Sequence, residues 1–253
     1  MRPENDFDLS IVTVTYNERE NIALLIRELN EIFSKSKIHA EIIVVDDSSP
    51  DGTAEEVRKL AKKYKTTRLI LRNGKLGIAS AYRDGINSAR GRIIIPMDAD
   101  FNHPPSRVAE FYRVASSGKI AFGSRYIGKR VFETDFAHFI GTTVINKWVS
   151  LLLQTGIKDN TNGFFAVPAN LLGKIRSYSN KKGIDPFDTV LSGIVISACA
   201  KKLKIPVVEL EAPYEKRRFG KSKIPFLSGL KIVLGNMMFT LKLRSKLRQS
   251  EIK

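Results

Sequence analysis

Two carboxylates and an amide stand at alternate positions directly behind an apolar run. Asp98, Asp100 and Asn102 follow residues 93–97 in the string DADFNHPP. Alternate residues of an extended chain point the same way, so these side chains can converge on one hard cation such as Mg2+ or Mn2+. Such a cation would carry a diphosphate. A simple turn after a strand is the alternative, because Asp, Asn and Pro all favour turns.

The elements that must position this motif alternate along the first hundred residues. Apolar patterns predict strands over residues 9–15, 41–47, 69–71 and 92–97. Helical spacing fills the intervals at residues 22–33, 53–65 and 78–89, the second opening with the capping-box pattern Thr-Ala-Glu-Glu. This βαβαβαβ succession predicts an α/β fold with a mostly parallel sheet and helices on both faces.

Polar residues follow all four predicted strands. They are Thr15, Tyr16, Asn17 and Glu18 after the first, Asp46 and Asp47 after the second, Arg72, Lys75 and Gly77 after the third, and the DxD residues after the fourth. Ligands of open α/β sheets bind beyond the carboxyl ends of the strands, so one crevice is expected there. The chain has neither GxGxxG after its first strand nor GxxxxGK[ST], which argues against dinucleotide-binding Rossmann and P-loop proteins.

The second half of the chain is less regular. Helices are expected over residues 106–116, 139–154 and 187–201, and strands over residues 120–122 and 206–211. Three motifs lie between them: GSRY at 123–126, DNTNGF at 159–164 and the basic loop RRFGKSK at 217–223. The basic loop could bind an oxyanion with its backbone and side chains together.

Charge is concentrated at the carboxyl end. The chain of 253 residues carries a net charge of +16, and residues 201–253 contain 14 Lys or Arg against 4 Glu. Nucleic acid, an anionic membrane and phosphorylated substrates all fit such a basic face. The single cysteine, Cys199, favours a reducing compartment, and the polar residues 1–8 lack the apolar core of a secretory signal. We therefore expect a cytoplasmic protein.

The segment 224–253 alternates apolar and basic residues. Its longest uncharged stretch, residues 232–241, is too short to cross a bilayer of about 30 Å. An amphipathic helix lying on the cytoplasmic face of a membrane is expected, with basic side chains among anionic headgroups. Packing on the protein's own core or on a second subunit is the alternative.

Taken together, these motifs resemble those of the family 2 nucleotide-sugar glycosyltransferases with the GT-A fold, and most of all the dolichyl-phosphate mannose synthases. The resemblance spans residues 9 to about 240 and rests on VTYNERENI, VVDDSSPDGT, KLG, DADFNHPP, GSRY, DNTNGF and RRFGKSK in that order. It implies a GT-A domain over residues 1–223, with a nucleotide-sugar half (1–105) and an acceptor half (106–223), followed by the segment 224–253.

The resemblance also implies roles for individual residues. Donor binding is implied for Thr15, Tyr16, Glu18, Asp46, Asp47, Lys75 and Asp98, and metal binding for Asp98, Asp100 and Asn102. Asp100 and Arg125 are implied as catalytic residues. Arg125, Arg217 and Lys223 would hold the acceptor phosphate, while the family's further acceptor positions, usually an arginine and a serine, fall on His138 and Thr142.

The implied reaction is inverting transfer of a hexose, with mannose from GDP-mannose favoured, to a dolichyl or polyprenyl phosphate for glycan assembly. UDP-glucose as donor and a sugar hydroxyl as acceptor remain alternatives, the latter requiring a carboxylate base. A basic nucleic-acid-binding protein is the non-enzyme alternative, but it leaves the acidic crevice unexplained, so no nucleic acid partner is expected. A membrane-anchoring partner or a homo-oligomer is also compatible with the tail.

Overall fold

The sheet confirms the predicted α/β class. The computed structural model describes residues 6–128, 136–213, 218–219 and 229–248. In these residues seven strands form one sheet in the order β3-β2-β1-β4-β6-β5-β7. Only β6 runs antiparallel to its neighbours, β4 and β5. The strands are β1 (Phe7–Thr15), β2 (Ala40–Asp46), β3 (Thr67–Leu71), β4 (Gly91–Asp98), β5 (Ile120–Ser124), β6 (Phe165–Pro168) and β7 (Val207–Glu211).

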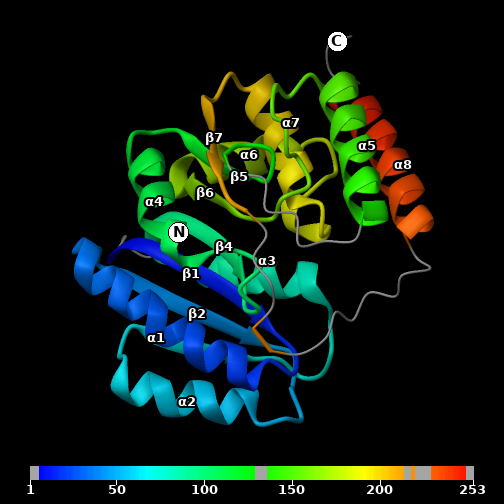
Figure 1. Cartoon of the computed structure of the whole chain (residues 1–253). Helices are drawn as coiled ribbons and strands as arrows, with labels where there is room; N and C mark the ends of the chain where they lie inside the picture. Colours follow the sequence, from blue (N-terminus) through cyan, green and yellow to red (C-terminus); the bar gives the residue numbers. More distant parts are fainter. Residues whose placement is uncertain (1–5, 129–135, 214–217, 220–228, 249–253) are drawn as a thin grey trace.

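Helices cover both faces of the sheet (Figure 1). One apolar core lies beneath α1 (Arg19–Ser36), α2 (Thr53–Lys63) and α4 (Val108–Ser116). The other core lies beneath α3 (Ile78–Ser88), α6 (Ala169–Asn180) and α7 (Ser192–Lys202). Short 3-10 turns, Pro105–Arg107 and Pro186–Asp188, precede α4 and α7. The resulting three layers place every βα connection of the first half at one edge.

The sequence pattern explains why the sheet is central. Every residue of β2 is buried, as expected for a parallel strand covered on both faces. Along β1, Leu9 and Ile11 face the α1 side while Val12 faces α3. Gly85 of α3 lets that helix approach closely, because a Cβ there would lie 2.4 Å from Cγ1 of Val12. The first strands are thus packed closely between the two helical layers.

Two helices, α5 (Phe136–Leu153) and α8 (Gly229–Arg248), pack side by side at one end of the molecule (Figure 1). Leu243 and Leu247 of α8 join the second core together with Ile145 and Val149 of α5. Lys246 Nζ donates a hydrogen bond of 2.9 Å to the carbonyl of Gly183. One face of α8 therefore packs on the protein itself, which was the alternative expectation for this segment.

No helix in the described part of the chain is long and apolar enough to cross a membrane.

Three details differ from the sequence prediction. Thr53 is the first residue of α2 rather than its cap, and its hydroxyl donates to Asp51 Oδ1 at 2.6 Å, so the predicted capping box is wrong. The pattern predicted neither β6 nor α6. The third predicted helix of the second half, 187–201, is a 3-10 turn followed by α7, which begins only at Ser192.

Candidate active site

The loops after β1 and β2 are joined by the carboxylate of Asp46. Thr15 Oγ1 donates to Asp46 Oδ2 at 2.7 Å, and the hydroxyl and backbone N–H of Ser49 donate to the same carboxylate at 2.6 and 2.9 Å. Asp46 is fully buried. The structure therefore brings Thr15 and Asp46 together as predicted, and the carboxylate joins the first two loops.

Asp47 fastens the third loop to the second. Its Oδ2 accepts a 2.9 Å hydrogen bond from the backbone N–H of Gly77, the residue that precedes α3. Its Oδ1 lies 3.0 Å from Nη1 of Arg72, an approach that is electrostatic and lacks hydrogen-bond geometry. Arg72 also donates to the carbonyl of Gly77 and to Ser80. Asp47 and Arg72 thereby hold the loop that carries Lys75.

The aromatic ring of Tyr16 contacts the cation on the third loop. The ammonium of Lys75 lies 4.1 Å from the ring centroid of Tyr16. Glu18, two residues on, accepts 2.7 Å from the side-chain amide of Asn21, and its backbone N–H donates to Thr53 Oγ1. A planar face with an adjacent cation is suited to a nucleobase and a phosphate.

The start of α2 is tied to the first loop by Asp51. Burial raises the pKa of this carboxyl. Hydrogen bonds from the Thr53 hydroxyl and from the backbone N–H groups of Arg19 and Thr53 lower the pKa by more than burial raises it, so the pKa lies below its usual value. Asp51 is therefore ionised at neutral pH and holds Arg19 and Thr53 in place.

Asp98 ends β4 with both carboxylate oxygens close to other side chains. The Tyr82 hydroxyl donates to Oδ1 at 2.8 Å, and Nε2 of His103 lies 3.7 Å from Oδ2. His103 Nδ1 accepts the backbone N–H of Asp98, and its ring stacks on Phe164 at 5.1 Å. Sequence reasoning did not single out Tyr82 or His103, although His103 lies inside the DADFNHPP motif.

Asp100 is oriented by its neighbour Asn102. The backbone and side-chain nitrogens of Asn102 donate to the two oxygens of Asp100 at 3.0 and 2.9 Å. Both residues are buried, and Phe101 between them adopts a left-handed φ of 70°. This turn places the Asn102 amide against Asp100, where it acts as an orienting group, while its role as a metal ligand stays a prediction.

The donor chemistry at this strand end fits a divalent cation. Mg2+ and related ions are commonly held by one or two carboxylates plus substrate phosphates rather than by a complete protein cage. Asp98 and Asp100 could supply two hard oxygen ligands, and the described residues contain no cluster of three or more His, Cys, Asp or Glu that could enclose an ion alone. The site suits a cation that arrives with a diphosphate.

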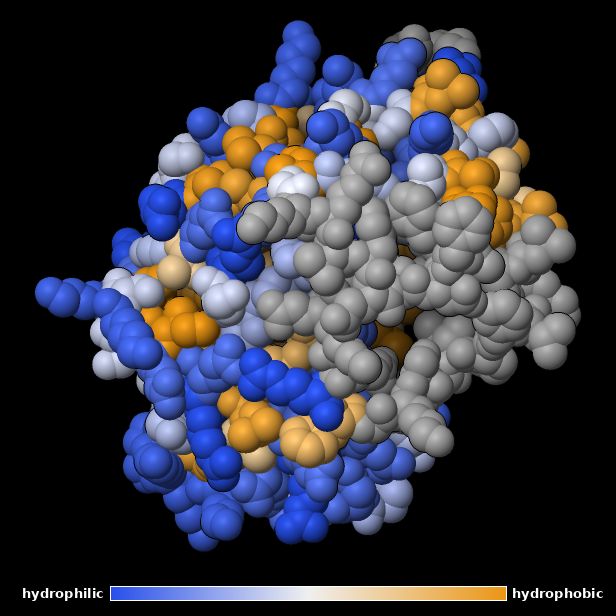
Figure 2. Space-filling model, in the orientation of Figure 1, coloured by the Kyte–Doolittle hydropathy of each residue, from blue (hydrophilic) through white to orange (hydrophobic). Residues whose placement is uncertain are grey.

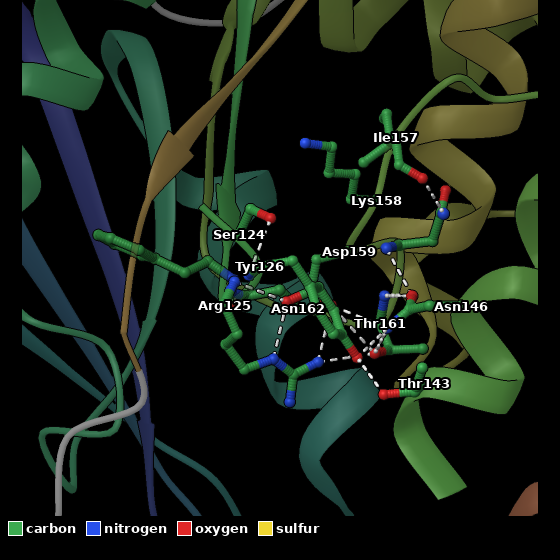
Figure 3. A network of polar contacts seen from close by, with 12 residues as sticks. Ser124, Arg125, Tyr126, Thr143, Asn146, Ile157, Lys158, Asp159, Thr161 and Asn162 are labelled. Carbon is green, nitrogen blue, oxygen red and sulfur yellow. Dashed lines mark hydrogen bonds and ion pairs between the residues drawn. The ribbon is translucent and has the colours of Figure 1, made fainter. Parts of the chain in front are cut away.

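The second half of the chain contributes a network around Arg125 (Figure 3). Nε and Nη2 of Arg125 each donate 2.7 Å hydrogen bonds to the carboxylate of Asp159, and Nη2 also reaches the Thr161 hydroxyl at 2.8 Å. Asp159 is fully buried. This bidentate pair fixes the plane of the guanidinium. The GSRY and DNTNGF motifs are therefore joined through Arg125 and Asp159, which lie 34 residues apart in the sequence.

The two halves meet where His103 packs against the DNTNGF turn. A Cβ on Gly163 would lie 3.6 Å from Cε1 of His103, and the adjacent Phe164 provides the stacked ring. The side of the site that carries Asp98 is thereby in contact with the turn that holds Arg125 through Asp159. The sequence predicted a crevice at the DxD motif but gave the DNTNGF turn no partner, and this contact brings the two motifs together.

Three predicted acceptor residues cannot be placed. Arg217 and Lys223, and the side chain of His138, lie outside the described residues, whereas Thr142 lies half-buried on α5. Two residues of the basic loop are described. Arg218 lies 3.8 Å from the ring centroid of Phe101 and pairs with Glu28 at 3.1 Å, and the carbonyl of Phe219 accepts from Asn21. The basic loop thus reaches the DxD turn.

Comparisons with solved structures identify the fold. Mannosyl-3-phosphoglycerate synthase from Rubrobacter xylanophilus has a TM-score of 0.58 at 17% identity, covering 98% of this chain and 77% of that one. The mannosyltransferase PcManGT from Pyrobaculum calidifontis, solved with GDP-Man and Mn2+, has a TM-score of 0.52 at 18% identity, covering 97% and 75%. At these identities the likeness establishes the GT-A fold.

Curated relatives are more similar in sequence. A dolichol-phosphate mannosyltransferase from Pyrococcus furiosus is 31% identical over 222 residues, 85% of this chain and 59% of that protein. This chain thus spans less than two thirds of the length of that relative. A polyprenol monophosphomannose synthase from Mycolicibacterium smegmatis is 29% identical over 221 residues, 85% of this chain and 80% of that protein.

The sequence profile of the family described as Glycosyl transferase family 2 matches residues 10–176, a range that begins in β1 and contains the DxD motif and the Arg125 network. The fold, the order of the motifs and this match agree: the chain belongs to glycosyl transferase family 2.

Proposed function

We propose that this protein transfers a hexose, with inversion, from a nucleotide diphosphate sugar to a polyprenyl phosphate. The observation that carries this proposal is the similarity to dolichol-phosphate and polyprenol-phosphate mannose synthases over 85% of the chain. Mannose from GDP-mannose is the favoured donor on the same ground. UDP-glucose is the second donor to test.

The donor half and the acceptor half of the site would bind different substrates. Tyr16, Lys75 and the loops held by Asp46 and Asp47 would receive the nucleotide. Asp98 and Asp100 would hold Mg2+ or Mn2+, which when bound neutralises charge on the leaving diphosphate. Residues 1–105 would form the donor half and residues 106–223 the acceptor half of the GT-A domain.

The acceptor phosphate would be oriented by Arg125, with Arg217, Lys223, His138 and Thr142 as further contacts. Asp159 fixes the guanidinium of Arg125 before any ligand arrives, so little reorganisation is needed when an anion binds. A phosphate monoester has a second pKa of about 6 and attacks as a dianion at neutral pH, so the reaction needs no general base. Alignment of the phosphate with the sugar carbon is the protein's main contribution.

A membrane surface is the expected source of the acceptor. Apolar residues gather on the surface over the paired helices α5 and α8 (Figure 2). Among the described side chains of these helices, the exposed large apolar ones are Ile140, Val144, Leu151, Ile232, Leu234, Met238 and Leu241. Exposed basic residues accompany them on α8, including Lys242, Lys246 and Arg248. An apolar face rimmed by cations is suited to anionic headgroups at the cytoplasmic face of a membrane.

The decisive experiment offers both donors. Purified protein with Mn2+ and a short polyprenyl phosphate is incubated with GDP-mannose or UDP-glucose, and the lipid phosphosugar is sought by mass spectrometry. Product from one donor fixes both reaction and sugar. Metal-dependent binding or hydrolysis of a donor without lipid product would retain the family assignment and refute the lipid acceptor.

A further inference from the structure

The side chain of Asn146 on α5 holds the turn that orients Arg125 (Figure 3). Its Oδ1 accepts the backbone N–H groups of Asn160 and Thr161 at 2.7 and 3.1 Å. Its Nδ2 donates to Asp159 Oδ1 and to the Thr161 hydroxyl, both at 3.1 Å. The residue is 3% exposed, so these bonds are made away from bulk water.

This arrangement requires an amide of this length. Oδ1 must accept from two backbone N–H groups, whereas Nδ2 must donate to a carboxylate that also binds Arg125. An alanine would leave the two N–H groups of the turn without their partner. An aspartate would retain an oxygen that accepts from both N–H groups, but it would place a second carboxylate against Asp159. Asn146 therefore determines both the backbone of the turn and the position of the Asp159 carboxylate.

We propose that Asn146 is a positioning residue that sets the placement of Arg125 through Asp159 and Thr161. It acts indirectly, because its side chain bonds to Asp159 and Thr161, which in turn bond to Arg125. The inference rests on the proposed function, in which Arg125 orients the acceptor phosphate. It adds that the alignment of this phosphate depends on helix α5, which precedes the turn in sequence and packs beside it.

The opposite face of α5 carries exposed apolar side chains. Ile140, Val144 and Leu151 recur at helical spacing and are exposed. Asn146 projects from the other side of the helix, the side that also buries Ile145 and Val149. Helix α5 is one continuous element of 18 residues, about 27 Å long. The proposed membrane-facing side chains and the residue that orients Arg125 therefore lie on the same helix.

The test compares Asn146→Ala and Asn146→Asp with Ser150→Ala. Ser150 is a matched control, because it also fastens α5 to the same loop, donating to the Ile157 carbonyl at 2.6 Å and accepting from Asn160, without contacting Asp159 or Arg125. Asn146→Asp retains an oxygen that accepts from both backbone N–H groups, and it serves if the alanine variant does not fold. Thermal unfolding of all three variants reports their folding.

We expect both Asn146 variants to lose about 10- to 100-fold in kcat/KM for a short polyprenyl phosphate, the cost of a misaligned reactant. The KM for the nucleotide sugar should stay within about threefold, since the donor half is untouched. Ser150→Ala should retain acceptor kcat/KM within about threefold. A merely structural role would lower the amount of active enzyme in all three variants alike. It would leave the KM values for donor and acceptor unchanged.

A second readout does not depend on turnover. The 15N NMR signal of the Arg125 Nε–H, assigned with Arg125→Lys, should shift in both Asn146 variants and keep its position in Ser150→Ala. An unshifted signal in Asn146→Asp, or wild-type acceptor kinetics in both variants, would overturn the inference. Failure of the wild-type protein to make any lipid product would instead refute the proposed function, and the NMR signal would still decide whether Asn146 positions Arg125.

Discussion

Nη1 of Arg72 lies 3.0 Å from Oδ1 of Asp47, and both side chains are more than nine-tenths buried. This ion pair joins the loop after β2 to the loop after β3, and the backbone N–H of Gly77 completes it by binding the other carboxylate oxygen. The pair thereby fixes the loop after β3, which carries Lys75. Asp47, which the resemblance assigned to donor binding, is thus engaged with the protein's own loops.

Removing one member of this pair should destabilise the folded protein. Arg72→Met leaves the Asp47 carboxylate buried without its cation, so we expect the free energy of unfolding to fall by about 3–5 kcal/mol. Urea denaturation followed by circular dichroism measures the loss. Arg58→Ala removes the solvent-exposed Arg58–Glu55 pair and should cost less than about 1 kcal/mol. Equal losses in the two variants would contradict a structural role for the buried pair.

Replacing Asp100 by Ala should lower turnover by at least about 1000-fold, a loss of the size expected when charge on the leaving group goes unneutralised. The fold should persist, because the bonds that Asp100 makes to Asn102 lie within one turn. Turnover with Mn2+ and the melting temperature are measured together. A folded Asp100→Ala variant with wild-type turnover would exclude a metal role for this carboxylate.

Tyr16→Leu should raise the KM for the nucleotide sugar by about 10-fold or more, because stacking of a base on an aromatic ring contributes about 1–3 kcal/mol. Tyr64, whose ring faces Lys63 in the same kind of pair at 5.0 Å, is the matched control on another surface. Initial rates at varied donor concentration give the KM of Tyr16→Leu and that of the control Tyr64→Leu, which should keep the wild-type KM. An unchanged KM in Tyr16→Leu would move the nucleobase elsewhere.

The exposed face of α5 and α8 can be tested with vesicles. Leu234 and Met238 are 52% and 60% exposed, and changing both to Asp should lower binding to anionic phospholipid vesicles by about 10-fold or more, because it removes apolar area and adds repulsion. Val190→Asp changes another exposed apolar residue, 68% exposed, that belongs to neither helix and should bind as the wild type does. Sedimentation with vesicles measures the bound fraction. Equal binding by all three proteins would exclude this face from membrane contact.

Cys199 should be chemically silent in the native protein. Burial raises the pKa of its thiol to about 12, so native Cys199 remains a neutral thiol at pH 8. An aromatic disulfide reagent should modify it only after unfolding in guanidinium. Because the unfolded thiol has the lower pKa, 9.0, native stability should decline as pH rises from about 9 toward 12. Rapid modification of the native protein at pH 8 would show that the α7 core opens.

The regular first half of the chain was predictable because periodicity alone determines it. Buried runs such as 42–45 and the spacing of Ile22, Leu25, Ile26 and Leu29 gave β2 and α1. Strand β6 was not predicted, since it has four residues and ends in Pro168. For α6 a signal was present in Leu172, Ile175 and Ser179, which are buried at helical spacing.

The partners within the site were harder to predict than its location. Arg125 and Asp159 are far apart in sequence, and their pairing depends on the register of β5 against β6, in which Phe122 lies opposite Phe165. No local pattern encodes that register. Asn146 was missed for the same reason, because an asparagine within a largely apolar helix has no distinctive spacing.

Strands β5 and β6 are consecutive along the chain, adjacent in the sheet and antiparallel. Everything from Ser124 to Phe164 is therefore a single excursion that leaves and re-enters the sheet at neighbouring points, and it contains Arg125, Asn146 and Asp159. The hydrogen bonds that join Arg125, Asn146 and Asp159 thus lie within one continuous segment of the chain. Exchanging this segment between relatives would transfer the three residues together, while the first four strands keep their own connections.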